Sequence, residues 1–264
     1  MSCHETSKLS PGGYDPSFFA RLAAVEDEHF WFRARNELIL RTVARLAASL
    51  PSHARIAEIG CGTGNVLRWL RQACPGCLVV GVDMWHEGLR YARERTDCFL
   101  VQAEIRSLPF SHAFHLIGVF DVLEHVADDR EALRRLRGVL VDRGWLIVTV
   151  PARVSLWSYF DDASGHCRRY SRQQLAERLH EAGFQLQFES EFMAPLLPAV
   201  WLWRKIIGAI LHRGSPPKKA AFGELRIVPG INGLLTWLLR AEAHRIARGR
   251  RSPFGVSLLA VARA

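Results

Sequence analysis

The chain has 264 residues, of which 49% are hydrophobic and 23% are charged, so its composition excludes a disordered or fibrous protein and predicts a globular one. Its net charge of +9 is unevenly distributed, because residues 195–264 hold twelve Lys or Arg against two Glu, a net +10 that leaves −1 for the rest. Such a segment favours an anionic partner, namely membrane headgroups, nucleic acid or a phosphorylated substrate, although a solvated basic face has the same composition.

The start of the chain and its cysteines predict the compartment. Residues 1–16 are polar and contain no apolar run that could serve as a secretory signal, which predicts a cytoplasmic protein. The six cysteines are then expected to be reduced thiols. Cys74 and Cys77 have the spacing of a redox or zinc half-site, but no second pair accompanies them, so a turn between a helix and a strand is the simpler interpretation.

Apolar residues that recur near the 3.6-residue period predict helices over 17–49, as part of a helical N-terminal cap over 1–50. A core over 51–192 follows, in which short apolar strands alternate with helices. Its strands are predicted at 55–59, 78–82, 98–101, 114–120, 145–150 and 184–192, and its helices at 65–73, 87–95, 129–140 and 171–182. With a final strand in 254–264, this alternation predicts an α/β fold with a doubly wound parallel sheet.

Residues 193–253 differ from the core and predict a basic, apolar helical insertion before the last strand. Arg204 and Lys205 interrupt its apolar part, 194–211, which leaves too short an apolar run for a membrane span. Trp201 and Trp203 beside these cations favour a helix lying in a membrane interface, and a lid buried over the active site would have the same pattern. A basic linker at 213–219 and a second helical stretch at 231–248 complete the insertion.

The turn after the first strand reads Glu58-Ile-Gly60-Cys61-Gly62-Thr-Gly64. Its glycines permit a sharp bend and close approach to a ligand, and the helix behind it offers free backbone amides. The dinucleotide fingerprint G-x-G-x-x-G is the nearest competitor, but the spacing here is G-x-G-x-G. With Glu58 two residues before Gly60, the turn resembles motif I of the class I S-adenosylmethionine-dependent methyltransferases.

Three later segments resemble the same family. Asp83 ends the second strand, where a carboxylate can accept both ribose hydroxyls of a nucleoside. Glu104 opens a segment that resembles the adenine loop, and residues 121–126, Asp-Val-Leu-Glu-His-Val, are typical of small-molecule members. The resemblance assigns cofactor contacts to residues from all of these segments and from the N-terminal helices: Arg35, Glu58, Gly60, Cys61, Gly62, Gly64, Asp83, Met84, Glu104, Ile105, Phe120 and Asp121.

The resemblance implies a Rossmann-like sheet of seven strands, mostly parallel with the last strand antiparallel, and S-adenosylmethionine as cofactor. Residues 28–36 and 165–171 resemble segments of a bacterial branch that is often linked to cell-envelope or polysaccharide biosynthesis. In related enzymes an N-terminal helix closes over the cofactor, so Arg33 or Arg35 could pair with the methionine carboxylate. The expected reaction is methyl transfer to an oxygen or carbon of a small acceptor, lipid-linked or saccharide-bearing, with peripheral contact to an anionic membrane.

Such a transfer needs a base only when the acceptor must lose a proton, because the methyl group is already activated. His125 and His166 are the candidates for that catalytic role, with an ordinary structural histidine as the alternative. Glu124, His125 and a remote carboxylate could instead hold a divalent ion, as in some similar quinone O-methyltransferases, but the expectation is a site without metal.

Two other functions stay open. RNA methylation would use the basic segment, but the Asn/Asp-Pro-Pro-Tyr/Phe motif of many nucleic-acid amino methyltransferases is absent from the sequence, which disfavours a nucleic-acid acceptor. A non-catalytic module that binds S-adenosylmethionine would keep the fold without the chemistry.

Overall fold

A computed structural model describes residues 15–211, 223 and 226–264, so the basic linker expected at 213–219 lies outside the described residues. Seven strands form one sheet: β1 (Arg55–Ile59), β2 (Leu78–Asp83), β3 (Phe99–Gln102), β4 (Phe114–Phe120), β5 (Leu140–Pro151), β6 (Gln185–Phe192) and β7 (Ser257–Arg263). Their order is β3-β2-β1-β4-β5-β7-β6, and β7 runs antiparallel to both neighbours while β1 to β5 pair in parallel. The predicted Rossmann-like fold is confirmed.

The helices agree with the predicted pattern with two differences, because the first predicted stretch is divided and a short helix at 159–163 was not predicted. They are α1 (Phe18–Val25), α2 (Phe30–Ala47), α3 (Asn65–Ala73), α4 (His86–Arg95), α5 (Asp129–Val139), α6 (Tyr159–Ala163), α7 (Arg172–Glu181), α8 (Leu197–Leu211) and α10 (Ile231–Ala247). The helical stretch predicted over 17–49 is divided between α1 and α2. His29 makes the division, because its backbone is extended and its ring Nδ1 accepts the amide of Trp31 at 3.2 Å, which caps α2.

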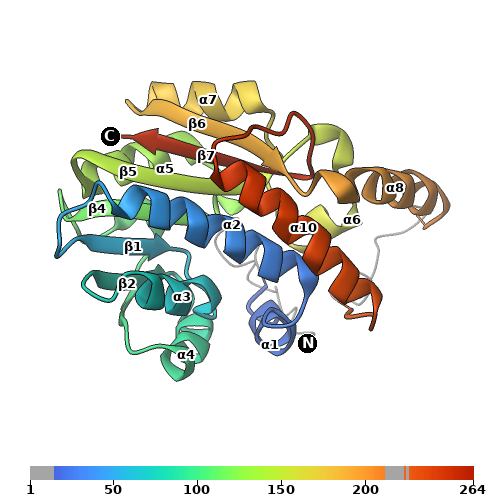
Figure 1. Ribbon diagram of the computed structural model, residues 1–264, viewed down its shortest axis with the longest axis horizontal. Coiled ribbons are helices and arrows are strands. Elements are labelled where there is room, and N and C mark those ends of the chain that lie inside the picture. The colour runs from blue at the N-terminus through green and yellow to red at the C-terminus, as the bar shows by residue number, and fades with distance from the viewer. Residues whose placement is uncertain (1–14, 212–222, 224–225) are drawn as a thin grey trace, which may run out of the picture.

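Both faces of the sheet are buried, which explains why its strands are nearly continuous apolar runs. Ile56 packs in a core with α2, α3 and α10, while its neighbour Ala57 packs in a second core with α5 and α7. In β5, Ile147 and Val148 divide between the same two cores. Figure 1 shows α2 and α10 side by side in front of the sheet. This three-layer arrangement leaves the carboxyl ends of the strands free to form a site.

In the described part of the chain between β6 and β7, the helices α8 and α10 differ in their surroundings. α10 lies along α2, and Asn232 fastens its start by accepting the amide of Phe30 at 2.8 Å and donating to the carbonyl of Glu28 at 2.9 Å. α8 instead extends away from the sheet (Figure 1). Within the described part of the chain, no helix combines the length and apolarity that crossing a bilayer requires.

Cys74 and Cys77 form a disulfide in the turn between α3 and β2. The predicted turn is confirmed, but the expectation that every cysteine is a reduced thiol is wrong for this pair. The turn brings the two Cα atoms to 5.3 Å, which is inside the range that a disulfide requires. Cys61 and Cys98 are buried free thiols, Cys167 is an exposed one, and Cys3 lies outside the described residues.

Candidate active site

A large cavity opens where β1, β2 and β4 end, the edge at which open α/β sheets commonly bind ligands. Its volume is about 1110 Å³, which exceeds the roughly 300–1,000 Å³ of most small-molecule sites. Aromatic side chains from α1 and the start of α2 line it as well. The predicted site residues that line the cavity are Arg35, Glu58, Gly60, Cys61, Gly62, Asp83, Met84, Glu104, Ile105, Phe120, Asp121, His125 and His166.

The glycine turn between β1 and α3 needs at least two of its glycines for steric reasons. Gly60 has φ +78°, and a Cβ at this position would lie 2.3 Å from Cγ2 of Val122. Gly64 has φ +76° at the start of α3, and a Cβ there would lie 2.9 Å from Ala92 in α4. Gly64 therefore permits the packing of α3 on α4 and, unlike Gly60 and Gly62, does not line the cavity.

Asp83 fastens the glycine turn to the end of β2. Its Oδ2 accepts the amide of Gly62 and its Oδ1 accepts the amide of Trp85, both at 2.8 Å. Burial raises the pKa of this carboxyl to about 6, although the backbone hydrogen bonds oppose the shift. Each oxygen keeps a further lone pair, so the ionised carboxylate can accept hydrogen bonds from a ligand in the cavity.

Arg35 reaches the cavity from α2 and pairs with Asp121, whose Oδ2 lies 2.5 Å from Nη1. Arg33, the alternative considered from the sequence, is exposed and outside the cavity wall. Glu58 lies nearby at the end of β1, and its Oε2 is buried without a hydrogen-bond partner among the described residues. Burial raises the pKa of Glu58 well above its usual value, and the charge of Arg35 offsets only part of this.

Glu104 and Ile105 lie on another wall of the cavity, at the start of the short 3-10 helix η1 (Ile105–Ser107). Ile105 is buried, while Glu104 is partly exposed and forms an ion pair with Arg106. The amide of Ala103 donates to the carbonyl of Asp83 at 3.0 Å, which joins this wall to the end of β2. The apolar side chain of Ile105 could pack on the face of a planar heterocycle, and the carboxylate of Glu104 could accept hydrogen bonds from its polar edge.

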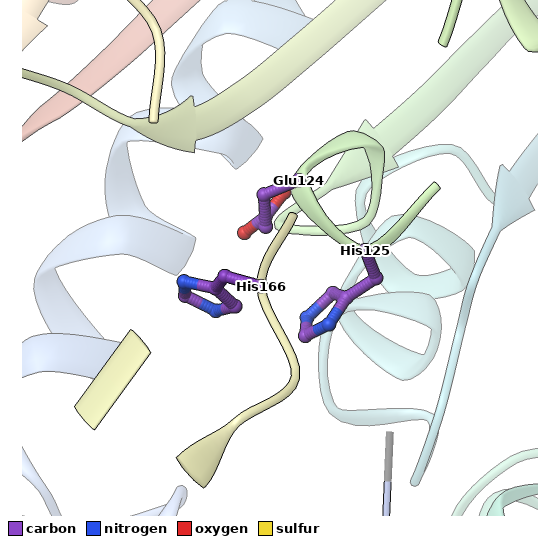
Figure 2. Close-up of side chains that lie close together, drawn as sticks. All are labelled: Glu124, His125 and His166. Carbon is purple, nitrogen blue, oxygen red and sulfur yellow. The ribbon is translucent and has the colours of Figure 1, made fainter. Parts of the chain in front are cut away.

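Glu124, His125 and His166 gather on the cavity wall, as Figure 2 shows. One potential ligand atom from each lies within 4.8 Å of the others, and the imidazole rings meet edge to face with centroids 4.7 Å apart. Burial, helped by the charge of Asp121, raises the pKa of Glu124 well above its usual value. Burial, helped by His166, lowers the pKa of His125 to about 3, so its imidazole is neutral.

Asp161, in α6, holds His166 in place. It is fully buried, and its Oδ1 lies 2.9 Å from Nδ1 of His166 and 2.7 Å from Nε of Arg169. Burial alone would raise its pKa, but the hydrogen bond from His166 and the charge of Arg169 prevail and lower it to about 2. The ionised carboxylate therefore accepts a hydrogen bond from Nδ1–H of His166, and in this tautomer the lone pair on Nε2 is the one that can accept a proton or bind a ligand.

The family is decided by the extent of a sequence match. The profile described as "Methyltransferase domain" matches residues 31–187, which is more than half of the chain and contains the glycine turn, Asp83 and the Glu124–His125 pair. The chain belongs to the class I S-adenosylmethionine-dependent methyltransferases. S-adenosylmethionine is its cofactor, as the sequence predicted.

Individual relatives agree with this family but differ in what their names say they act on. The methyltransferase is 28% identical over 161 residues to a protein of Mycobacterium tuberculosis H37Rv named as S-adenosylmethionine-dependent methyltransferase. It is 30% identical over 139 residues to trans-aconitate 2-methyltransferase of Escherichia coli UTI89. These matches cover 60% and 52% of the chain and 56% and 51% of the relatives, so the chain spans little more than half the length of the curated relatives it matches.

Solved structures support the fold. A methyltransferase in complex with the Trm112 activator of Haloferax volcanii aligns over 97% of both chains, with a TM-score of 0.61 and 20% identity. Phosphoethanolamine N-methyltransferase 2 of Haemonchus contortus, solved with S-adenosylmethionine, aligns with a TM-score of 0.54 and 19% identity over 84% of this chain and 51% of that one. At sequence identities this low, the similarity shows that the fold is shared and nothing more.

The residues of this methyltransferase fit its cofactor. The glycine turn brings backbone close to the cavity, and the Asp83 carboxylate offers acceptors for hydroxyl groups. Oε2 of Glu58, which has no hydrogen-bond partner among the described residues, could accept one from a cationic group of the cofactor. Asp161 is an important residue that was not predicted from the sequence, because no helix was expected between the strand at 145–150 and the helix at 171–182. A signal existed, since Ser158 and Asp161 form a capping box and so mark the start of a helix.

Proposed function

We propose that the protein transfers the methyl group of S-adenosylmethionine to a hydroxyl oxygen of a small, lipid-linked acceptor. The observation that carries this proposal is the cluster of Glu124, His125 and His166 on the wall of an oversized cavity. These side chains could accept a proton or bind an oxygen atom. They therefore suit a hydroxyl group, which must lose its proton when it is methylated, better than a free amine, which can be methylated before it loses one. A cavity volume of about 1110 Å³ leaves room for a cofactor and an acceptor together.

The cofactor is proposed to lie across the glycine turn. Asp83 accepts the two ribose hydroxyls, Ile105 and Glu104 meet the adenine, and the methionine end lies toward Arg35 and Glu58. This orientation is supported by the cavity lining, which brings these residues from separate elements to one site. The sulfonium methyl would then face the cluster, because β1, which ends beside Glu58, is the parallel neighbour of β4, and the segment after β4 contains Glu124.

The reaction is a substitution at carbon. The O–CH₃ bond forms as the S–CH₃ bond breaks, the sulfur retains the electron pair to give S-adenosylhomocysteine, and the acceptor leaves as a methyl ether. The hydroxyl proton is lost toward the cluster and then to water. In-line positioning supplies most of the rate, so the walls of the cavity matter as much as the proton acceptor.

Cofactor binding should depend on pH through Asp83. The pKa of this carboxyl is about 6, so its ionised form, which accepts two hydroxyls, prevails above pH 6 and is lost below it. The affinity for S-adenosylmethionine is expected to be constant above about pH 7 and to fall by up to about tenfold per pH unit below 6. Isothermal titration calorimetry between pH 5 and pH 8 measures it.

Asp83→Asn is the matching variant. It should weaken binding at pH 7.5 by about 10- to 100-fold, as expected for the loss of a hydrogen bond to a charged group, and should flatten the pH dependence. Asp97→Asn, which changes a carboxyl whose side chain is 78% exposed, should alter neither quantity. An Asp83→Asn protein that retains the wild-type pH profile would remove Asp83 from the cofactor site.

The acceptor is proposed to enter from an anionic membrane. Large apolar side chains are exposed on α8 and on the first turns of α10, which project at the same end of the molecule (Figure 1). Trp201 is 50% exposed and Trp237 is 68% exposed. Trp203 and Leu235, on the same two helices, line the cavity. Aromatic side chains within the +10 segment, residues 195–264, suit the interface of a membrane with anionic headgroups.

Vesicle binding tests this surface. The full chain should sediment with phosphatidylglycerol-containing vesicles at low salt, and the double variant Trp201→Ser/Trp237→Ser should bind at least about tenfold more weakly, because each buried Trp contributes on the order of 1 kcal/mol or more. Trp69→Ser is the control, because Trp69 is 38% exposed on α3, in another part of the molecule. Absence of binding to anionic vesicles contradicts the membrane proposal, and binding to RNA but not to lipid would favour RNA methylation instead.

A further inference from the structure

We propose that Glu124, His125 and His166 form a binding site for one divalent transition-metal ion, and that this ion holds the acceptor oxygen. The inference rests on the proposed function for the role of the ion, but the site itself can be tested without any acceptor. It replaces the expectation of a metal-free site, and the third ligand is an imidazole from the loop after α6 rather than a remote carboxylate.

The side chains of Glu124, His125 and His166 converge on one point. They come from two segments about forty residues apart, and the amide of Cys167 donates to the carbonyl of Glu124 at 2.6 Å, which holds the His166 loop against η2 (Leu123–His125). The potential ligand atoms lie within 4.8 Å of one another. Because metal–ligand bonds of about 2.1 Å place two ligands at most about 4.2 Å apart, small side-chain rotations would complete the site.

The carboxyl group of Glu124 is buried in a place that favours a bound cation. The residue is 1% exposed, and its Oε2 has no hydrogen-bond partner among the described residues. The buried cations nearby are already engaged, since Arg35 pairs with Asp121 and Arg169 pairs with Asp161. A buried carboxylate oxygen without a partner is costly, and a bound cation would supply the missing counter-charge.

The carboxylate of Asp161 orients the ring of His166 as in many metal-binding histidines. A metal-binding histidine commonly donates its other ring N–H to a carboxylate, which fixes the ring and the tautomer. Asp161 does this for His166 at 2.9 Å, and Arg169 fixes Asp161 in turn. The arrangement leaves Nε2 of His166 as the ligand atom.

The ligand set also indicates the kind of ion. Two imidazoles and one carboxylate, with the remaining positions open to the cavity, suit Zn²⁺, Fe²⁺, Mn²⁺ or Co²⁺, whereas Mg²⁺ prefers oxygen ligands. An ion at this site would bind the acceptor hydroxyl through an open position and lower its pKa. The hydroxyl proton would leave to water, and the oxygen would remain on the ion until the new O–CH₃ bond forms.

Cobalt binding tests the site directly. The tag-free, full-length protein is stripped of metal and titrated with Co²⁺, which reports its ligands through visible absorption bands. We expect one ion per chain, and displacement of Co²⁺ by an equimolar amount of Zn²⁺. Glu124→Gln and His166→Ala should each weaken binding by more than the roughly 10- to 100-fold that loss of a supporting partner costs, and Asp161→Asn should weaken it within that range.

Two controls keep the result specific. Cys167→Ser should bind Co²⁺ as the wild type does, because the neighbouring thiol is exposed and outside the ligand set. His180→Ala removes an exposed imidazole on α7 and should also have no effect. Circular dichroism and the unfolding temperature show whether each variant is folded, and Glu124→Gln, which conserves side-chain volume, remains informative if His166→Ala is not.

The outcomes separate the two proposals. Stoichiometric binding that depends on Glu124 and His166, in a protein without methyl transfer, would support the metal site and defeat the proposed function. Methyl transfer by a protein that binds no transition metal, or whose binding is unchanged in Glu124→Gln and His166→Ala, would overturn the metal site and leave the function standing.

Discussion

Replacing Gly60 with Ala is expected to reduce the affinity for S-adenosylmethionine by at least about 100-fold and to destabilise the fold by about 2–4 kcal/mol. The backbone at this position has φ +78°, which a residue with a Cβ rarely adopts, and the new Cβ would lie 2.3 Å from Cγ2 of Val122. Either the glycine turn or the chain around Val122 must then move. Titration calorimetry and urea unfolding measure the two effects.

Two variants separate the causes. Gly60→Ala/Val122→Ala removes the close contact but keeps the backbone strain, so it should recover only part of the lost stability. Gly138→Ala, in the last turn of α5 with nothing within 4 Å of its added Cβ, should leave binding unchanged and stabilise the fold by up to about 1 kcal/mol. Unchanged binding and stability in Gly60→Ala would contradict the proposed position of the cofactor.

Replacing Asp161 with Ala is expected to destabilise the protein by about 3–5 kcal/mol, because it leaves a buried guanidinium without its counter-charge. Asp161 is fully buried, and the side chain of its partner Arg169 is only 5% exposed. The same change frees the ring of His166, which Asp161 fixes at 2.9 Å. Methyl transfer should therefore be lost even where the variant is folded, and unfolding in urea followed by an activity assay separates the two losses.

The neighbouring carboxyl provides the control. Asp162 is exposed, and its side chain accepts a hydrogen bond from Nε1 of Trp157, so Asp162→Ala should change the free energy of unfolding by less than about 0.5 kcal/mol. The free energy of unfolding at low pH gives a second measurement of the role of Asp161. The pKa of Asp161 falls from 3.8 to about 2 on folding, so its ionisation stabilises the native state above pH 4, and this contribution is lost as the pH falls toward 2. Asp161→Asn should lack that component, and equal acid stability in both proteins would contradict it.

The sequence was sufficient for the central strands of the sheet because β1, β4 and β7 are buried on both faces and so read as apolar runs. It was also sufficient for most of the cavity wall, since the ends of parallel strands meet at one edge and Gly60, Asp83 and Asp121 follow three such ends. Gly64 shows the limit of motif reasoning, because its missing Cβ makes room for Ala92 in α4 rather than for a ligand.

The remaining features depend on contacts between distant segments, which spacing does not encode. His166 could be named as a candidate, but its placement beside Glu124 depends on the hydrogen bond from Cys167 and on the buried carboxylate of Asp161. The disulfide was missed for a different reason, because its two cysteines are only three residues apart and its formation depends on how the local turn between them is folded.

Transfer of label from methyl-labelled S-adenosylmethionine to a lipid extract of bacterial membranes tests the central claim most directly. We expect a labelled, organic-soluble product that resists mild alkali, as a methyl ether does and a methyl ester does not. Glu124→Gln and His166→Ala should each lose this product. Label that appears in RNA, or the absence of any labelled product from a protein that binds S-adenosylmethionine, would contradict it.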